Sequence, residues 1–201
     1  MKDINQTPLW TAVITPLKED GKIDFDSLKK LLKAQEAAGN GVLTLGSTGE
    51  ALNLDKSETE EILDFTLDQN LSVPIMCGVG GINLGETTKW VEYLNTKNLD
   101  AYLMVSPLYA KPGDEGQYEW FKTLMDTSNK PVMLYNVPGR TGLPLSLNAV
   151  ERLNTHENFW AIKEASGSPE KFKEYVKASG INCRVYSGYD GVILLALLAG
   201  I

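Results

Sequence analysis

The chain has 201 residues, of which 43% are hydrophobic and 22% are charged, and its formal net charge at pH 7 is -7. This composition is typical of a globular protein with one sizeable core. The acidic balance, without any block of Lys and Arg, argues against a nucleic-acid-binding surface. Its longest apolar run, residues 192–201, is too short to span a membrane. The amino terminus lacks the apolar core of a signal peptide, so we expect a cytoplasmic protein.

Seven short apolar runs predict β-strands. They cover residues 11–15, 41–45, 73–77, 101–105, 131–135, 160–164 and 184–187. Most are apolar on both faces, which is typical of parallel strands covered by helices on both sides.

Amphipathic stretches between these runs predict helices over residues 27–38, 85–95, 117–125, 145–153 and 169–178, with one more beginning at Ser57. Ser57 and Glu60 fit the S-x-x-E spacing of a capping box. Strands alternating with helices predict an α/β fold, specifically a (β/α)8 barrel, as a single domain over residues 1–201. A doubly wound open sheet is the alternative.

The predicted barrel has no eighth strand. A typical barrel needs ~250 residues, and seven strands cannot close without exposed edges. We therefore expect the chain to represent a barrel through about strand seven, with strand eight and any C-terminal helices missing.

Lys163 lies inside an apolar strand, where an ammonium group loses its hydration. Desolvation lowers a lysine pKa, and the neutral amine can form a Schiff base with a ketone or aldehyde. The structural alternatives are a lysine that extends to solvent at the strand end, or one that pairs with Glu164.

Polar and glycine-rich segments follow several predicted strands, and the carboxyl ends of barrel strands are where barrel enzymes place their chemistry. These segments are 46–50, 106–109, 135–142 and 187–190. The 46–50 turn offers hydroxyls and backbone N–H groups to a small carboxylate, or is an ordinary capping turn. Tyr109 and Tyr135 could relay protons or only pack, and Arg140 could clamp a carboxylate or be a solvated loop residue.

The remaining inventory disfavours other chemistries. His156 is the single histidine, which argues against a Ser-His-Asp triad and a histidine-rich metal site. Cys77 and Cys183 lie in no paired motif, so neither a disulfide framework nor a thiolate metal site is indicated.

Three segments together resemble the dihydrodipicolinate synthases (4-hydroxy-tetrahydrodipicolinate synthases), of the pyruvate-dependent class I aldolase family that also includes N-acetylneuraminate lyase. They are Gly-Ser-Thr-Gly-Glu at 46–50, Tyr-Asn-Val-Pro-Gly-Arg-Thr-Gly at 135–142 and Ile-Lys-Glu-Ala-Ser-Gly at 162–167. The run that contains Arg140 favours the synthases over the lyases. Ser47 departs from the family pattern, which usually has threonine there.

The resemblance implies a barrel enzyme, a lyase that condenses pyruvate with L-aspartate-4-semialdehyde on the diaminopimelate route to lysine. Lys163 would form the Schiff base, with Ser47, Tyr109 and Tyr135 as a proton relay. Thr48, with the neighbouring turn amides, would hold the pyruvate carboxylate, Arg140 would bind the semialdehyde, and Gly188 would be a further substrate-binding residue. No cofactor or metal would be needed. Tyr109 would reach a neighbouring subunit, so the resemblance implies a homo-oligomer, a dimer or tetramer.

Lysine-inhibited synthases tend to carry a serine, a histidine and an aromatic where this chain has Ala51, Lys56 and Leu108. An ammonium at Lys56 would repel a cationic effector, so we expect weak or absent inhibition by lysine. Two other functions stay open: a related pyruvate aldolase acting on a sugar acid, and a non-catalytic truncated barrel.

Overall fold

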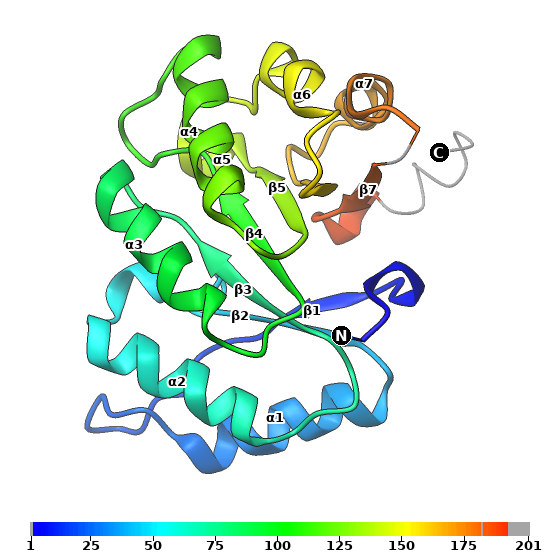
Figure 1. Ribbon diagram of the computed structural model, residues 1–201. Coiled ribbons are helices and arrows are strands. Elements are labelled where there is room, and N and C mark those ends of the chain that lie inside the picture. Colours follow the sequence, from blue (N-terminus) through cyan, green and yellow to red (C-terminus); the bar gives the residue numbers. More distant parts are fainter. Residues whose placement is uncertain (1, 182, 193–201) are drawn as a thin grey trace. The chain divides into compact units, whose positions relative to one another are not determined.

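The computed structural model describes residues 2–181 and 183–192 (Figure 1). Strands and helices alternate along the chain, as the sequence predicts. The strands are β1 (Trp10–Ala12), β2 (Gly41–Thr44), β3 (Ile75–Val79), β4 (Ala101–Val105), β5 (Val132–Asn136), β6 (Phe159–Glu164) and β7 (Arg184–Ser187). They are hydrogen-bonded in chain order from β1 to β7, and β1–β2, β2–β3, β5–β6 and β6–β7 pair in parallel.

Helices connect these strands. They are α1 (Phe25–Ala37), α2 (Lys56–Asp68), α3 (Leu84–Asn95), α4 (Asp114–Thr127), α5 (Pro138–Thr141), α6 (Leu147–Leu153) and α7 (Pro169–Ser179), with 3-10 turns η1 (Ile4–Gln6), η2 (Ala51–Asn53) and η3 (Asp190–Val192). The four-residue helix α5 was not predicted, because its sequence, Pro-Gly-Arg-Thr, has no apolar period.

Several predicted boundaries were wrong by a few residues. β1 ends at Ala12 rather than Thr15, and α4 begins at Asp114 rather than Gln117. The third strand begins at Ile75 rather than Val73, since Pro74 has no N–H to donate to the ladder. The capping box of α2 is formed by Asp55 and Glu58 rather than Ser57 and Glu60. The Asp55 carboxylate accepts from Glu58 N–H, and the Glu58 carboxylate accepts from Asp55 N–H.

The chain divides into two compact units. The first consists of Met1–Val79 and Thr96–Leu103. Its core side chains come from α1, α2 and the first strands, and Leu32, Val42 and Leu63 are fully buried. In Figure 1, α1 and α2 lie side by side. Cys77 is buried in this unit and, like the less buried Cys183, is a free thiol.

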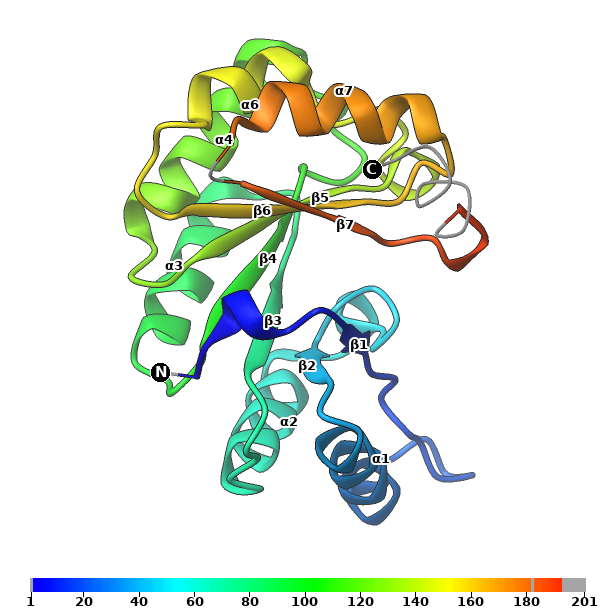
Figure 2. The same ribbon diagram turned by 90° about the vertical axis from the view of Figure 1, so that its right-hand side faces the viewer.

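The second unit consists of Gly80–Asn95 and Met104–Ile201. Figure 2 shows α6 and α7 lying along one face of β6 and β7. Phe121, Leu134, Val150 and Ile162 are fully buried there. The single-domain prediction over residues 1–201 stays a prediction, and the apolar run after Val192 lies outside the described residues.

Within residues 2–181 and 183–192, no helix has both the length and the apolar character needed to cross a membrane.

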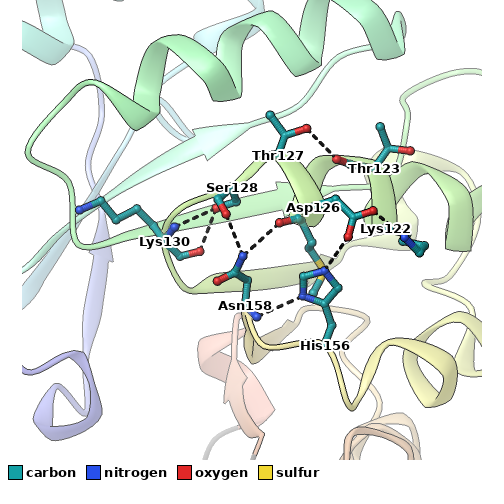
Figure 3. A network of polar contacts seen from close by, with 9 residues as sticks. Lys122, Thr123, Asp126, Thr127, Ser128, Lys130, His156 and Asn158 are labelled. Atoms are coloured by element: carbon teal, nitrogen blue, oxygen red, sulfur yellow. Dashed lines mark hydrogen bonds and ion pairs between the residues drawn. The ribbon is translucent and has the colours of Figure 1, made fainter.

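A polar network joins the end of α4 to the start of β6 (Figure 3). Asn158 donates its side-chain amide to the Met125 and Ser128 carbonyls, at 3.1 and 2.8 Å. Its backbone N–H donates to His156 Nδ1, and His156 Nε2 lies 3.1 Å from Asp126 Oδ1. His156, the single histidine, is therefore part of a helix-end contact at the amino ends of the strands.

Candidate active site

The central pair of the candidate site is Lys163 and Tyr135, which stand opposite each other in the β5–β6 ladder. Lys163 Nζ lies 4.7 Å from the centroid of the Tyr135 ring. Tyr135 is 8% exposed, so its ring forms an apolar wall beside the amine. The ladder register therefore brings together the two residues that the sequence analysis singled out for imine chemistry.

The electrostatic surroundings of Lys163 favour its neutral form. Burial lowers the pKa of Lys163 from its ordinary value, and the positive charge of Arg140 lowers this pKa further. The Asp190 carboxylate acts in the opposite direction and raises it. Lys163 consequently holds a neutral, nucleophilic amine at a lower pH than a solvated lysine does.

Glu164 is not the partner of Lys163, which corrects one alternative from the sequence. Successive side chains of a strand point to opposite faces, so Glu164 points away from Lys163. Glu164 is only 2% exposed, and its carboxylate has other partners. One oxygen accepts from Asn136 Nδ2, and the other accepts from Ser166 N–H at 2.7 Å and from Ser166 Oγ. Lys163 is thus left without an ion pair to its neighbour in sequence.

Gly188 lies against the Lys163 side chain. A Cβ at this position would stand 2.8 Å from Lys163 Cε and 2.9 Å from its Cγ. The Gly188 N–H donates to the Glu164 carbonyl at 2.7 Å, so the backbone is fixed at this distance. A glycine is therefore required for Lys163 to keep its position.

Arg140 lies on α5, immediately after β5, and its side chain is exposed. Thr141 Oγ1 donates to the Leu143 carbonyl at 2.7 Å, and Gly142 ends the helix with a left-handed φ of 75°. A Cβ at Gly142 would stand 2.6 Å from Lys111 Cε. Arg140 lies on α5, and Lys111 lies against Gly142 at the end of the same helix. Two cationic side chains near this helix suit an anionic substrate.

Tyr109 is 88% exposed and has a left-handed backbone, with a φ of 65°. Such a conformation is uncommon for a bulky residue and points to a special position. Among the described residues, the structure does not bring the Tyr109 side chain to Lys163 or Tyr135.

Ser47 and Thr48 lie in the first unit, in the turn that follows β2. The turn is framed by left-handed residues, Leu45 and Glu50, with φ values of 54° and 55°. Thr15 Oγ1 donates to the Gly49 carbonyl at 2.7 Å, and this hydrogen bond holds the turn in place. The Ser47 and Thr48 side chains are exposed. This turn presents two hydroxyls, as the carboxylate-binding reading of the sequence requires.

In residues 2–181 and 183–192, no cluster of three or more His, Cys, Asp or Glu side chains is arranged to hold a metal ion.

The geometry can be compared with known proteins. The sequence model of the Dihydrodipicolinate synthetase family matches residues 5–201. The chain belongs to this family. A curated relative, 4-hydroxy-tetrahydrodipicolinate synthase of Francisella philomiragia subsp. philomiragia, is 48% identical over 191 residues, which are 95% of this chain and 64% of the relative. The chain thus spans just under two thirds of the length of that relative.

The solved structures that resemble this chain include dihydrodipicolinate synthases, which supports the family assignment. Dihydrodipicolinate synthase from Bacillus anthracis matches with a TM-score of 0.92 and 33% identity, over 100% of this chain and 68% of that one. The chloride-inhibited dihydrodipicolinate synthase from Acinetobacter baumannii, complexed with pyruvate, matches with a TM-score of 0.90 and 33% identity, over 96% and 67%. The predicted family and the α/β barrel class are confirmed, and the open-sheet alternative is set aside.

Two features of the site were missed from the sequence. The Glu164–Asn136 contact joins residues 28 positions apart, and no local pattern predicts it. Asp190 was noted only as part of the segment after β7, although its charge acts on Lys163. Their positions in the sequence could have indicated them. Asn136 and Glu164 directly follow Tyr135 and Lys163, and Asp190 lies two residues after Gly188, all at the carboxyl ends of strands.

Proposed function

We propose that the protein condenses pyruvate with L-aspartate-4-semialdehyde to 4-hydroxy-tetrahydrodipicolinate, by a Schiff-base mechanism. The observation that carries the proposal is the amine of Lys163, partly buried beside the Tyr135 ring with its pKa lowered. The names of the curated relatives support the choice of reaction.

In the proposed reaction, the neutral amine of Lys163 attacks the ketone carbon of pyruvate, and the carbonyl oxygen leaves as water. Tyr135 donates and accepts the protons of this exchange. Loss of a proton from the methyl carbon gives an enamine. The enamine carbon forms a bond to the semialdehyde carbonyl carbon, whose oxygen takes up a proton, and the imine to Lys163 forms again. The amino group of the semialdehyde then attacks the imine carbon, which closes the ring and releases Lys163 as the free amine.

The other predicted residues take supporting roles. Ser47 and Tyr109 continue the proton relay from Tyr135, and Thr48 with the amides of its turn binds the pyruvate carboxylate. Gly188 lines the pyruvate position beside Lys163, and Arg140 binds the carboxylate of the semialdehyde. The exposure of the Ser47, Thr48 and Tyr109 side chains is consistent with these roles. The reaction needs no cofactor, because the imine itself accepts electrons.

The first experiment is reduction of the full-length protein with borohydride in the presence of pyruvate, followed by peptide mass spectrometry. We expect one reduced pyruvyl group on Lys163, and none in Lys163→Met. Lys171→Met is the matched control, since Lys171 is a surface residue paired with Glu174. No adduct on Lys163 of the folded wild-type protein would remove the aldolase reading.

The acceptor is tested with the same protein by supplying different aldehydes with pyruvate. We expect turnover with L-aspartate-4-semialdehyde and a large loss of that turnover in Arg140→Gln. Faster turnover with a sugar aldehyde would assign the chain to a sugar-acid aldolase instead. Trapping without turnover on any aldehyde would favour a protein that only binds pyruvate.

We propose further that the protein acts in the cytoplasm as a homo-oligomer, a dimer or tetramer, with Tyr109 of one subunit reaching its neighbour. The exposure and the left-handed backbone of Tyr109 support this role. Sedimentation of the wild type and of Tyr109→Ala tests it. A wild-type protein that stays monomeric at assay concentration and remains active would contradict it.

We also propose that lysine inhibits the enzyme weakly or not at all. The structure adds one qualification to the charge argument, since Lys56 Nζ lies 3.7 Å from Glu60 Oε1 and part of its charge is balanced. Inhibition of the full-length enzyme at sub-millimolar lysine would overturn the proposal.

A further inference from the structure

The β5–β6 pair has two polar faces at its carboxyl end. Tyr135 pairs with Lys163, and the next residues along each strand, Asn136 and Glu164, pair with each other. Because side chains alternate along a strand, the Asn136–Glu164 pair lies on the face opposite the Tyr135–Lys163 pair. The buried pair is therefore directly behind the proposed catalytic pair.

Asn136 and Glu164 are 1% and 2% exposed. Asn136 Nδ2 donates to one oxygen of Glu164, and Asn136 Oδ1 accepts from the Leu145 N–H at 2.8 Å. The Leu145 carbonyl in turn accepts from Tyr175 Oη at 2.6 Å. A continuous line of hydrogen bonds thus runs from the loop after β6 through β5 to α7.

The Glu164 carboxylate is satisfied by neutral donors alone. It accepts from Asn136 Nδ2, Ser166 N–H and Ser166 Oγ, and no salt bridge joins it to another described residue. A buried carboxylate without a cation is costly, and natural proteins keep such groups where they do specific work.

The contacts lie where the backbone ladder ends. After Asn136 the chain turns into α5, and after Glu164 it turns through Gly167, whose φ is 80°. The Asn136–Glu164 hydrogen bond continues the pairing one step past Tyr135 and Lys163. The Asn136–Leu145 bond also closes the base of the loop 137–144, which carries Arg140.

The backbone of Glu164 adds a third restraint. Its carbonyl accepts from Gly188 N–H at 2.7 Å, and Gly188 lies against the Lys163 side chain. A shift of Glu164 would therefore move Lys163 itself, the glycine beside it and the loop of Arg140 together.

We propose that Glu164, through Asn136 and Ser166, is a positioning residue that fixes the Lys163 amine against Tyr135 from the opposite face of the sheet. The inference rests on the proposed function for its kinetic readout. Sub-ångström placement of reacting groups is worth large factors in rate, so loss of the network should slow imine formation more than it weakens pyruvate binding.

The test exploits the polarity of the network. In Glu164→Gln, one acceptor oxygen becomes an NH2 group, which must face a donor on Asn136 or on Ser166. In the double variant Asn136→Asp with Glu164→Gln, the new amide at position 164 can donate to the new carboxylate at position 136. That carboxylate can still accept from the Leu145 N–H. This swap keeps the shape and the net charge, and it restores every hydrogen bond with one of them reversed.

The measurement is the rate of pyruvate-imine formation on the full-length protein, by borohydride trapping at saturating pyruvate. We expect Glu164→Gln to slow trapping about 10-fold or more with the KM for pyruvate within about 3-fold. The double variant should recover most of the loss. Ser166→Ala removes one donor to Glu164 and the acceptor of the Ser168 N–H, and it should give a smaller slowing of the same kind.

Val150→Ala is the matched control, because Val150 is fully buried on α6 and its apolar side chain supplies none of these hydrogen bonds. Equal trapping rates in Glu164→Gln, Ser166→Ala and the control, compared at equal losses of Tm, would overturn the inference. So would a folded double variant no faster than Glu164→Gln.

Failure of the proposed function is distinguishable from failure of this inference. A wild-type protein that forms no adduct with pyruvate refutes the function. The positioning role is then measured by the rate at which trinitrobenzenesulfonate modifies Lys163. This rate should change in Glu164→Gln and return in the double variant, and an unchanged rate would overturn the inference on its own.

Discussion

The two ends of the β5–β6 pair use polar side chains in different ways. At the amino end, Asn158 supplies hydrogen bonds to the carbonyls of Met125 and Ser128, at the end of α4 (Figure 3). At the carboxyl end, Lys163 donates no hydrogen bond to another described residue and faces the Tyr135 ring. The first arrangement satisfies groups that any helix end leaves open, whereas the second places a partly buried amine against an aromatic ring and satisfies no backbone group of the described residues.

This contrast teaches where to look for chemistry in such a sheet. Polar groups that complete the backbone stabilise the fold, and polar groups that the backbone does not need are candidates for function. Barrels separate the two in space, with stability at the amino ends of the strands and catalysis at the carboxyl ends. Variants at both ends can break or sharpen this comparison.

Lys163→Met should have the largest effect on activity and little or none on stability. We expect trapping with pyruvate to fall by about 10³-fold or more, because the variant lacks the amine that forms the proposed Schiff base. The Tm should stay the same or rise, since a partly buried charge is removed. Trapping assays and thermal unfolding measure both, and a clear fall in Tm would show that Lys163 is also needed for folding.

Asn158→Ala should have the reverse pattern, with a clear loss of stability and little change in activity. Two carbonyls lose their hydrogen bonds, so the free energy of unfolding should fall by about 2 kcal/mol. The folded protein should trap pyruvate at the wild-type rate. Asn148→Ala, an exposed position on α6, is the control and should leave the unfolding free energy almost unchanged. An equal loss of unfolding free energy in both variants would mean that the helix-end contacts of Asn158 stabilise the protein no more than an exposed side chain does.

Arg140→Gln and Asp190→Asn should move the pH dependence of trapping in opposite directions. The Arg140 charge lowers the pKa of Lys163, so its removal should raise the pH at which trapping becomes half-maximal. Asp190 raises this pKa, so its removal should lower that pH. Asp190→Asn keeps the shape of its side chain, whereas Arg140→Gln shortens it as the charge is removed. Shifts of the same sign would contradict the electrostatic account of the site.

The pKa of Lys163 also bears on stability. Because it is lower in the folded state than in the unfolded state, the unfolded state binds more protons between the two values. The free energy of unfolding should therefore rise with pH across that window.

Asp126→Asn should have the smallest effect. Its contacts with Lys122 and then His156 lower the pKa of Asp126, so the stability they contribute is present at neutral pH and lost as the pH falls through the lowered pKa. The carboxylate is about half exposed, so we expect less than about 1 kcal/mol at pH 7, screened by salt. Glu157→Gln, next to His156 in the loop before β6, is the control, and a deficit that persists at low pH would refute this interpretation.

Much of the fold followed from the sequence, because strands covered on both faces are continuous apolar runs and amphipathic helices have a clear period. All of the described strands were predicted, and so were the described helices apart from α5. Local rules also located the residues at the strand ends. Boundaries were less secure where a single group decides them, such as Pro74 in β3 or Asp55 before α2.

The missing part of the site was the set of contacts made between distant residues. Glu164 was predicted as a possible partner of Lys163, and its actual partner, Asn136, became apparent only once β5 and β6 were aligned in register. The same is true of Asn158, whose acceptors are 30 and 33 positions away. Side-chain partners of this kind depend on register, which composition and periodicity do not specify.

The bond from the Leu145 N–H to Asn136 has a consequence for hydrogen exchange. Leu145 lies between α5 and α6 and belongs to no helix or strand, yet its amide hydrogen is held by a side chain that is 1% exposed. Loop amides usually exchange with solvent quickly, whereas this one can exchange only when the end of β5 opens. Its exchange rate in deuterated solvent therefore reports, for a single atom, how often the segment that carries Arg140 leaves its place.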